Sequence, residues 1–134
     1  MYGLTSVMES SMINIEVSLI RQLTIYTLTG KTTLQDLLEE VDNFYKQEPT
    51  ENVLWNLLEA NLYNLNAKDA EIISNHSARY DNNIKRRKTA IVSNNEHTYL
   101  LAEWFKLYGE MDNLPFKVGV FESLSEAKHW LDWA

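Results

Sequence analysis

The chain has 134 residues, a length typical of one domain, and a net charge of −7 from 19 acidic and 12 basic side chains. This acidic balance disfavours nucleic acid as the partner, because a protein that binds a duplex usually presents a basic face. Cysteine is absent, which excludes disulfides, thiolate nucleophiles and cysteine-based zinc sites.

No leader and no membrane span are predicted. The first basic residue is Arg21, so no positively charged region precedes an apolar segment, as a secretory signal requires. The uncharged run from Gln22 to Gly30 is far shorter than the roughly 20 residues that cross a bilayer. We therefore expect a cytoplasmic protein.

The first predicted elements form a hairpin. Residues 1–12 show no clear hydrophobic period and are predicted to be a loose lead-in to a domain that spans residues 13–134. Apolar and polar residues alternate from Ile13 to Leu19, as in a half-exposed strand. A second strand is predicted from Leu23 to Gly30, antiparallel to the first.

Helices and strands then alternate. A capping box at Thr32 or Thr33 precedes apolar residues at helical spacing, which predict a first helix. The later predicted segments are a buried strand at Val53–Leu58, a helix from Asn66 towards Tyr80, a strand at Thr89–Ser93, a helix after Asn95 that Gly109 closes, a strand at Phe116–Phe121 and a helix from Ser123. This order predicts an α/β fold with a single open mixed sheet, in which an opening antiparallel hairpin is followed by mostly parallel strands and four helices cover the sheet.

Three segments carry a family resemblance. Thr29-Gly30 closes a strand before a helix, Val53–Leu57 forms a central strand with an asparagine-leucine step, and Val118–Ala127 joins the last strand to a helix that contains Trp130-Leu131. In this order the segments resemble the SpoIIAA-like proteins and the wider STAS domains (sulphate transporter and anti-sigma-factor antagonist). The resemblance implies a scaffold for regulation, for partner binding or for small-ligand binding.

The chain departs from that family at its switch. In the antagonists an aspartate-serine-serine-glycine run opens the helix after the central strand, and one serine is phosphorylated. Here the region reads Leu65-Asn66-Ala67-Lys68-Asp69 and holds no hydroxyl residue, so the phosphoserine switch does not carry over.

The resemblance nevertheless implies a partner surface on the second helix and the loop before it. The candidate partner-binding residues are therefore Asn64, Asn66, Lys68 and Asp69. Trp133 joins them because an exposed tryptophan is a favoured interface residue. We expect another protein, or a second copy of this chain in a homodimer, as the partner.

A ligand site is predicted outside the carboxyl ends of the strands, where ligands bind in open α/β sheets. Asn61, Asn94, Asn95 and His97 follow these ends and could converge there as uncharged hydrogen-bonding groups. The alternative is that Asn94 and Asn95 serve as helix N-caps, which asparagine does well.

No catalytic residue, metal site or cofactor is predicted. His76, His97 and His129 fall on three different predicted helices, and His76 is expected to be a hydrogen-bonded histidine on an apolar helix face. The leading hypothesis is a non-catalytic regulatory or protein-interaction domain. The alternative is a carrier of a small apolar molecule or lipid, which needs an apolar cavity between helices and sheet; an enzyme that uses His97 comes third.

Two further groups are interpreted as structural. The basic run Lys85–Lys88 is expected to complement a helix end and to guard a strand edge rather than to bind an anionic partner. The aromatic residues Trp104, Phe105, Tyr108, Trp130 and Trp133 are expected to form the contact between two neighbouring helices.

Overall fold

The computed structural model describes residues 12–80 and 84–132 of the chain. It contains one five-stranded sheet in which the strands lie in the same order as in the sequence, β1-β2-β3-β4-β5. The β1–β2 pair is antiparallel and every later pair is parallel, which confirms the predicted mixed sheet. The predicted lead-in, apart from Met12, and the candidate Trp133 lie outside the described residues.

Nine elements make up this part of the chain, and their bounds agree with the predicted segments to within a few residues. They are β1 (Met12–Ser18), β2 (Leu23–Lys31), α1 (Leu34–Lys46), β3 (Asn52–Asn61), α2 (Ala67–Ser77), β4 (Lys88–Val92), α3 (Glu96–Met111), β5 (Lys117–Phe121) and α4 (Leu124–Asp132).

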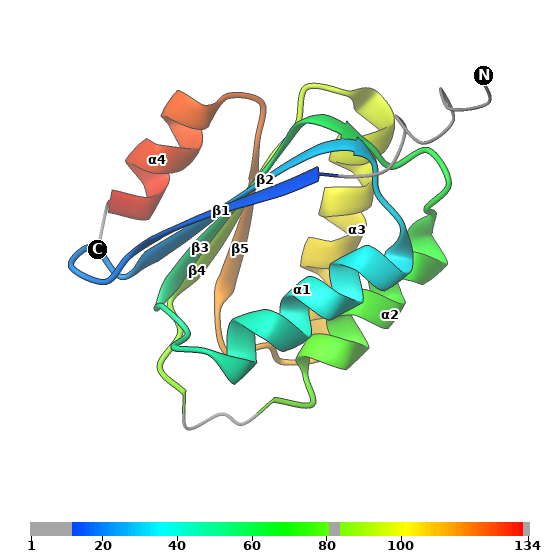
Figure 1. The fold of residues 1–134 in the computed structure, drawn as a ribbon. Coiled ribbons are helices and arrows are strands. Elements are labelled where there is room, and N and C mark those ends of the chain that lie inside the picture. Colours follow the sequence, from blue (N-terminus) through cyan, green and yellow to red (C-terminus); the bar gives the residue numbers. More distant parts are fainter. Residues whose placement is uncertain (1–11, 81–83, 133–134) are drawn as a thin grey trace, which may run out of the picture.

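The helices divide unequally between the two faces of the sheet. Figure 1 shows α1, α2 and α3 together on one face and α4 alone on the other. Each of the first three helices connects one parallel strand to the next in the same direction, and because such crossovers are right-handed they fall on the same face. Helix α4 follows the last strand, is not a crossover, and covers the opposite face.

Two apolar cores result, one on each face of the sheet. The larger core lies under α1, α2 and α3 and includes the stacked rings of Tyr26 and Trp55, whose centroids are 4.2 Å apart. The smaller core joins α4 to the middle strands through Leu54, Val92 and Leu131. The cavity described below belongs to the larger core.

Local signals set the helix ends. Thr33 and Asp36 form the predicted reciprocal capping box of α1. The prediction that Gly109 closes α3 is wrong, because the helix continues to Met111 and Asn113 adopts the left-handed conformation beyond it, with φ of 57°. Gly109 is instead buried inside the helix, where its missing side chain leaves room for Leu114.

The prediction that the aromatic residues form a contact between two neighbouring helices is also wrong. Trp104 stacks on Tyr108 of the same helix, whereas Trp130 of α4 packs against Phe121 of β5. Helices α3 and α4 lie on opposite faces of the sheet, so their tryptophans cannot form one layer (Figure 1). In the described part of the chain, no helix combines the length and the apolar character that crossing a membrane requires.

Candidate functional site

The larger core contains an apolar cavity of about 120 Å³ between the three helices and strands β3 and β4. Apolar side chains from all of these elements line it, among them Leu37, Val41, Phe44, Val53, Leu57, Ala70, Ile73, Leu101, Ala102 and Phe105. The cavity required by the carrier hypothesis is therefore present. Its wall is largely hydrocarbon and aromatic, as in most small-molecule sites.

One cationic side chain, Arg86, lies in the cavity wall. It lies two residues before β4, at the amino end of the parallel strands and opposite to the edge where the sequence predicted a ligand site. Its guanidinium donates hydrogen bonds from Nη1 to the Tyr45 hydroxyl (2.7 Å), from Nη2 to Thr89 Oγ1 (2.9 Å) and from Nε to the Glu51 carbonyl (3.3 Å).

Three aromatic rings surround the same guanidinium. The Cζ atom of Arg86 lies 4.3 Å from the centroid of Phe116, 4.9 Å from that of Phe44 and 5.9 Å from that of Tyr45. Such contacts with ring faces stabilise a cation that has lost water. Burial nevertheless lowers the pKa of Arg86 below its usual value, although the neighbouring Tyr45 opposes the effect.

The basic run is therefore only partly a surface feature. Lys85 is exposed and pairs with Glu51 at 3.6 Å, but Arg86 faces the cavity. Lys88 is buried on the opposite face of the sheet, where its Nζ donates to the Trp130 carbonyl at 2.7 Å. Arg86 and Lys88 thus lie on opposite faces of the sheet, and neither is a fully exposed cation.

A polar cluster next to the cavity joins α1 to α2. His76 Nε2 lies 2.7 Å from Asp42 Oδ1, so His76 is hydrogen-bonded, as predicted. The Tyr80 hydroxyl donates to the same carboxylate oxygen, and the Tyr80 ring stacks on Tyr45 at 4.3 Å. These two hydrogen bonds lower the pKa of Asp42, whereas burial and the bond to Asp42 raise the pKa of Tyr80 to about 12.

Three of the four candidate ligand residues at the carboxyl edge, Asn61, Asn95 and His97, contact Tyr63. Asn95 is the N-cap of α3 and donates from Nδ2 to the Tyr63 hydroxyl at 3.0 Å. The Tyr63 ring stacks on His97, and Asn61 Oδ1 accepts the Tyr63 amide. His97 Nε2 also lies within 3.1 Å of the carbonyls of Leu62 and Leu65.

These bonds fix the loop between β3 and α2 against the start of α3. Asn61 Oδ1, both side-chain polar atoms of Asn95 and His97 Nε2 are engaged within the protein, and Asn94 is exposed beside them. Among the described residues, the hydrogen-bond partners of His97 Nε2 are backbone carbonyls.

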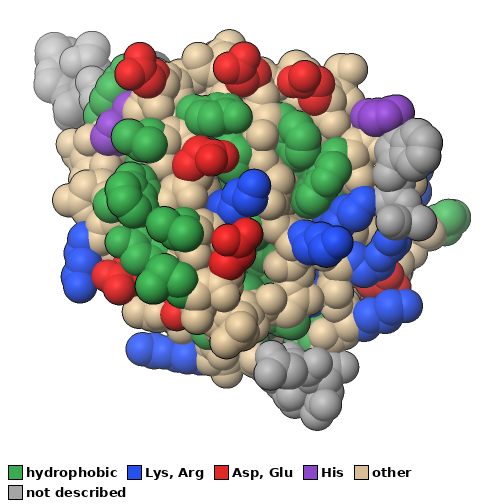
Figure 2. All heavy atoms as spheres, turned by 180° about the vertical axis from the view of Figure 1, so that it is seen from behind, with side chains coloured by type: hydrophobic (Ala, Val, Ile, Leu, Met, Phe, Trp, Pro, Cys, Tyr) green, Lys and Arg blue, Asp and Glu red, His purple; other side chains and the backbone are tan. Residues whose placement is uncertain are grey.

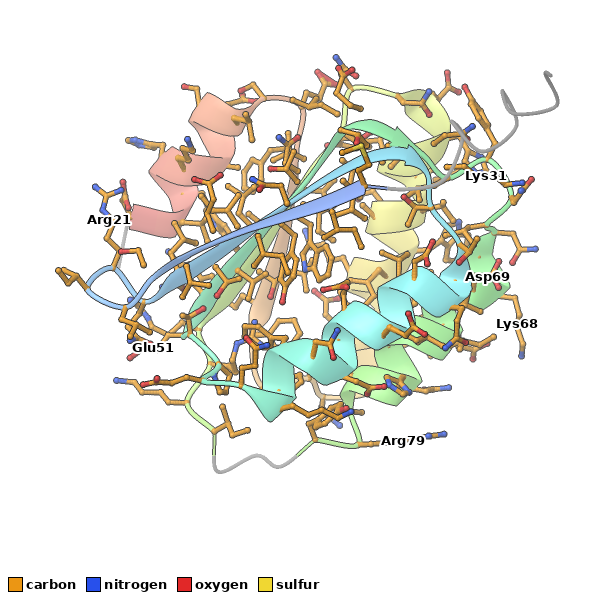
Figure 3. All side chains as sticks on the ribbon, viewed as in Figure 1. Arg21, Lys31, Glu51, Lys68, Asp69 and Arg79 are labelled. Carbon is orange, nitrogen blue, oxygen red and sulfur yellow. The ribbon has the colours of Figure 1, made fainter. Side chains whose placement is uncertain are left out.

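The candidate partner loop lies at the same edge. Asn66 and Asp69 form a capping box at the start of α2, which leaves their side chains engaged in the helix terminus. Asn64 is exposed, and the side chain of Lys68 is 74% exposed and lies 3.4 Å from Glu71. Figure 3 shows Lys68 directed away from the body of the protein at this end of α2.

An apolar stripe runs along the outer face of α3. Its members recur at helical spacing and are between 36% and 67% exposed: Leu100, Trp104, Leu107 and Met111. Figure 2 shows apolar side chains gathered over the half of the molecule where α3 lies. The stripe begins next to the β3–α2 loop, because His97 in the first turn of α3 holds that loop.

The sequence analysis named an apolar cavity only as a requirement of the carrier hypothesis, and it did not place Arg86 in a cavity wall. Strand alternation gives no signal for Arg86, because Thr89 and Ile91 face the cavity and the same period would place Arg87 there. Among the described residues, no group of three histidine, aspartate or glutamate side chains is arranged to hold a metal ion.

No protein-family profile matches the sequence, and no curated protein matches it. Among solved structures, the fold is similar to the crystal structure of an anti-sigma factor antagonist from Mycobacterium paratuberculosis, with a TM-score of 0.60 over 92% of this chain and 95% of that chain. The two sequences are 12% identical, so the likeness concerns the fold. The predicted SpoIIAA-like resemblance is thereby confirmed at the level of architecture: this chain has the fold of an anti-sigma factor antagonist.

Proposed function

We propose that this protein is a non-catalytic regulatory domain that binds another protein through the outer face of α3 and the adjoining Asn64–Asp69 loop. The observation that carries the proposal is the exposed apolar stripe on α3, which includes Trp104 and Leu107. Large apolar side chains grouped on a helix face commonly mark an interaction surface. The solved protein that shares the fold is named for antagonising an anti-sigma factor, which is itself a protein.

The loop adds polar groups to the rim of this surface. Asn64 and Lys68 are exposed in the segment that follows the contacts of His97 with the loop, and polar groups at the edge of an apolar surface are common in interfaces. Phosphorylation of the loop is not part of the proposal, since Asn64–Asp69 contains no hydroxyl side chain.

Site-specific photo-crosslinking in cells tests this proposal. A photoreactive residue at Leu107 or at Lys68 is expected to crosslink to one defined protein, which mass spectrometry identifies. The matched control is Lys128, which is exposed on α4 on the opposite face of the sheet. A product at twice the mass of the chain would indicate the homodimer, and equal products at Lys128 and Leu107, or none, would contradict the proposal.

A specific observation also favours a second candidate function, the binding of a small apolar molecule. The cavity of about 120 Å³ lies in the core between helices and sheet and is lined mainly by apolar groups. A cavity of this size can hold a small ligand without any change of the fold.

A further inference from the structure

The size of the cavity limits what it can hold. A volume of about 120 Å³ is close to that of an engineered apolar cavity of about 150 Å³ that binds benzene. One aromatic ring, or an aliphatic chain of roughly six carbons, therefore matches the space. A whole phospholipid tail does not.

The two ends of the cavity carry opposite charges. Arg86 lies in the wall near the amino ends of β4 and β5, where Phe116 also contributes. Asp69 lies in the wall near the carboxyl end of β3, and its carboxylate caps α2. A ligand with one negative group is therefore attracted to the Arg86 end and repelled from the Asp69 end.

Arg86 also has unused hydrogen-bonding capacity. A guanidinium carries five N–H groups, and three of them donate to Tyr45, Thr89 and the Glu51 carbonyl. One N–H on each terminal nitrogen has no acceptor among the described residues. The ion pairs within this part of the chain do not include Arg86.

A partly buried arginine that faces an apolar cavity, with no anionic partner among the described residues, is unusual. Removing a cation from water is costly, and contacts with aromatic rings offset only part of the cost. Two free N–H groups on one guanidinium match the two oxygens of a carboxylate. A phosphate dianion fits less well, because Arg86 is the only cation among the described residues of the wall, which also contains Asp69 and the hydroxyls of Ser77 and Thr98.

We propose that the cavity binds a small monocarboxylate, whose apolar body fills the space between α1, α2 and α3 and whose carboxylate pairs with Arg86. This inference rests on the second candidate function and assigns its ligand class. It is independent of the protein-binding surface on α3. The ligand chemistry is that of an aromatic acid with one ring or of a short-chain fatty acid.

Calorimetric titration with benzoate, hexanoate and the neutral benzyl alcohol tests the proposal. Benzoate is expected to bind the wild-type protein at least roughly tenfold more tightly than benzyl alcohol. The Arg86→Gln variant is expected to bind benzoate no better than benzyl alcohol. Lys85→Gln removes the same charge from the neighbouring residue, whose side chain is 77% exposed, and is expected to bind benzoate like the wild type.

A second variant tests the cavity without touching the charge. Ala102 is buried in the cavity wall, so Ala102→Leu places added methyl groups in the space that the ligand body would take. This variant is expected to lose the binding of benzoate and benzyl alcohol alike.

The outcomes test the role of Arg86 separately from the binding of a ligand in the cavity. Equal binding of benzoate and benzyl alcohol by the wild type would overturn the role of Arg86 and leave the cavity as a site for neutral ligands. No binding of any of the three probes at millimolar concentration would overturn both the carboxylate assignment and the second candidate function. The wild-type comparison decides the matter even if Arg86→Gln fails to fold.

Discussion

Two carboxylates on α1, Asp42 and Glu40, lie in opposite environments, and their effects on stability should differ in sign. Asp42 accepts hydrogen bonds from Tyr80 and His76, and these bonds lower the pKa of Asp42. A lowered pKa in the folded state means that the ionised carboxylate stabilises the fold. This contribution is present above the ordinary value of 3.8 and is lost as the pH falls through the folded-state pKa.

Asp42→Asn should therefore destabilise the protein at neutral pH. We expect its free energy of unfolding to fall by about 1–2 kcal/mol, the lower part of the range for hydrogen bonds to a charged group, because Asp42 is half-buried. Urea unfolding at pH 7 and at about pH 3 measures the effect, which should shrink at the lower pH. Glu39→Gln, on the exposed side of the same helix, should change little at either pH.

Glu40→Gln should have the opposite effect. One oxygen of Glu40 is buried without a hydrogen-bond partner among the described residues, and burial raises the pKa of this carboxyl. The ionised form thus costs stability at neutral pH, and the cost grows as the pH rises through the ordinary pKa of 4.5. We expect the variant to unfold at a higher urea concentration at pH 7, and a lower midpoint would contradict the assignment.

At the scale of elements, the contact between β5 and α4 depends on Gly119. A Cβ atom at this position would lie 2.8 Å from Phe121 Cε2 and 3.1 Å from Trp130 Cη2, so both rings would have to move. Gly119→Ala is expected to lower the free energy of unfolding by about 1–3 kcal/mol, as overpacking does.

Gly109→Ala is the matched control for this substitution. The added Cβ would lie 3.1 Å from the end of the Leu114 side chain, which can give way, and alanine favours the helix by about 1 kcal/mol over glycine. Thermal unfolding of both variants is the measurement. A Gly109→Ala protein that is destabilised as much as Gly119→Ala would show that the ring contact is not the cause.

Elements were predicted well where the signal is local. Capping and strand alternation depend on neighbours in the sequence. The structure has helices that begin after Thr33 and Asn95 and a strand that contains Ile13 to Val17. The end of α3 was missed because Gly109 resembles a helix terminator, whereas its role is to admit Leu114 from the following loop. That role depends on a tertiary contact.

At the candidate ligand site, the proximity of Asn61, Asn95 and His97 follows from their places after the strand ends. Their contacts with Tyr63 and with the carbonyls of Leu62 and Leu65 depend on tertiary packing, which the sequence pattern does not record. The cavity is a gap left by side chains from five elements, and no sequence pattern records such a gap. Arg86 was grouped with Lys85–Lys88 as a cation near a helix end and a strand edge, because nothing in the run distinguishes the residue that faces the cavity.

At the scale of the whole molecule, the sheet should open from its edges. Strand β3 is paired on both sides, whereas β1 is paired only with β2 and carries the exposed side chains of Ile15 and Val17. Amide hydrogen exchange is expected to be slowest in β3 and several-fold or more faster in β1, because edge strands open without global unfolding. Equal protection of both strands at all denaturant concentrations would contradict this expectation.

The identity between strand order in space and strand order in the chain has a consequence for synthesis on the ribosome. Each strand after β1 finds its neighbour already made when it emerges, so the nascent chain can extend the sheet one strand at a time. Helix α4 is the last described element to emerge, and until then Leu54 and Val92 lack the cover that buries them. Until α4 has been made, the face of the nascent sheet that carries Leu54 and Val92 therefore stays exposed to solvent, and α4 then covers it.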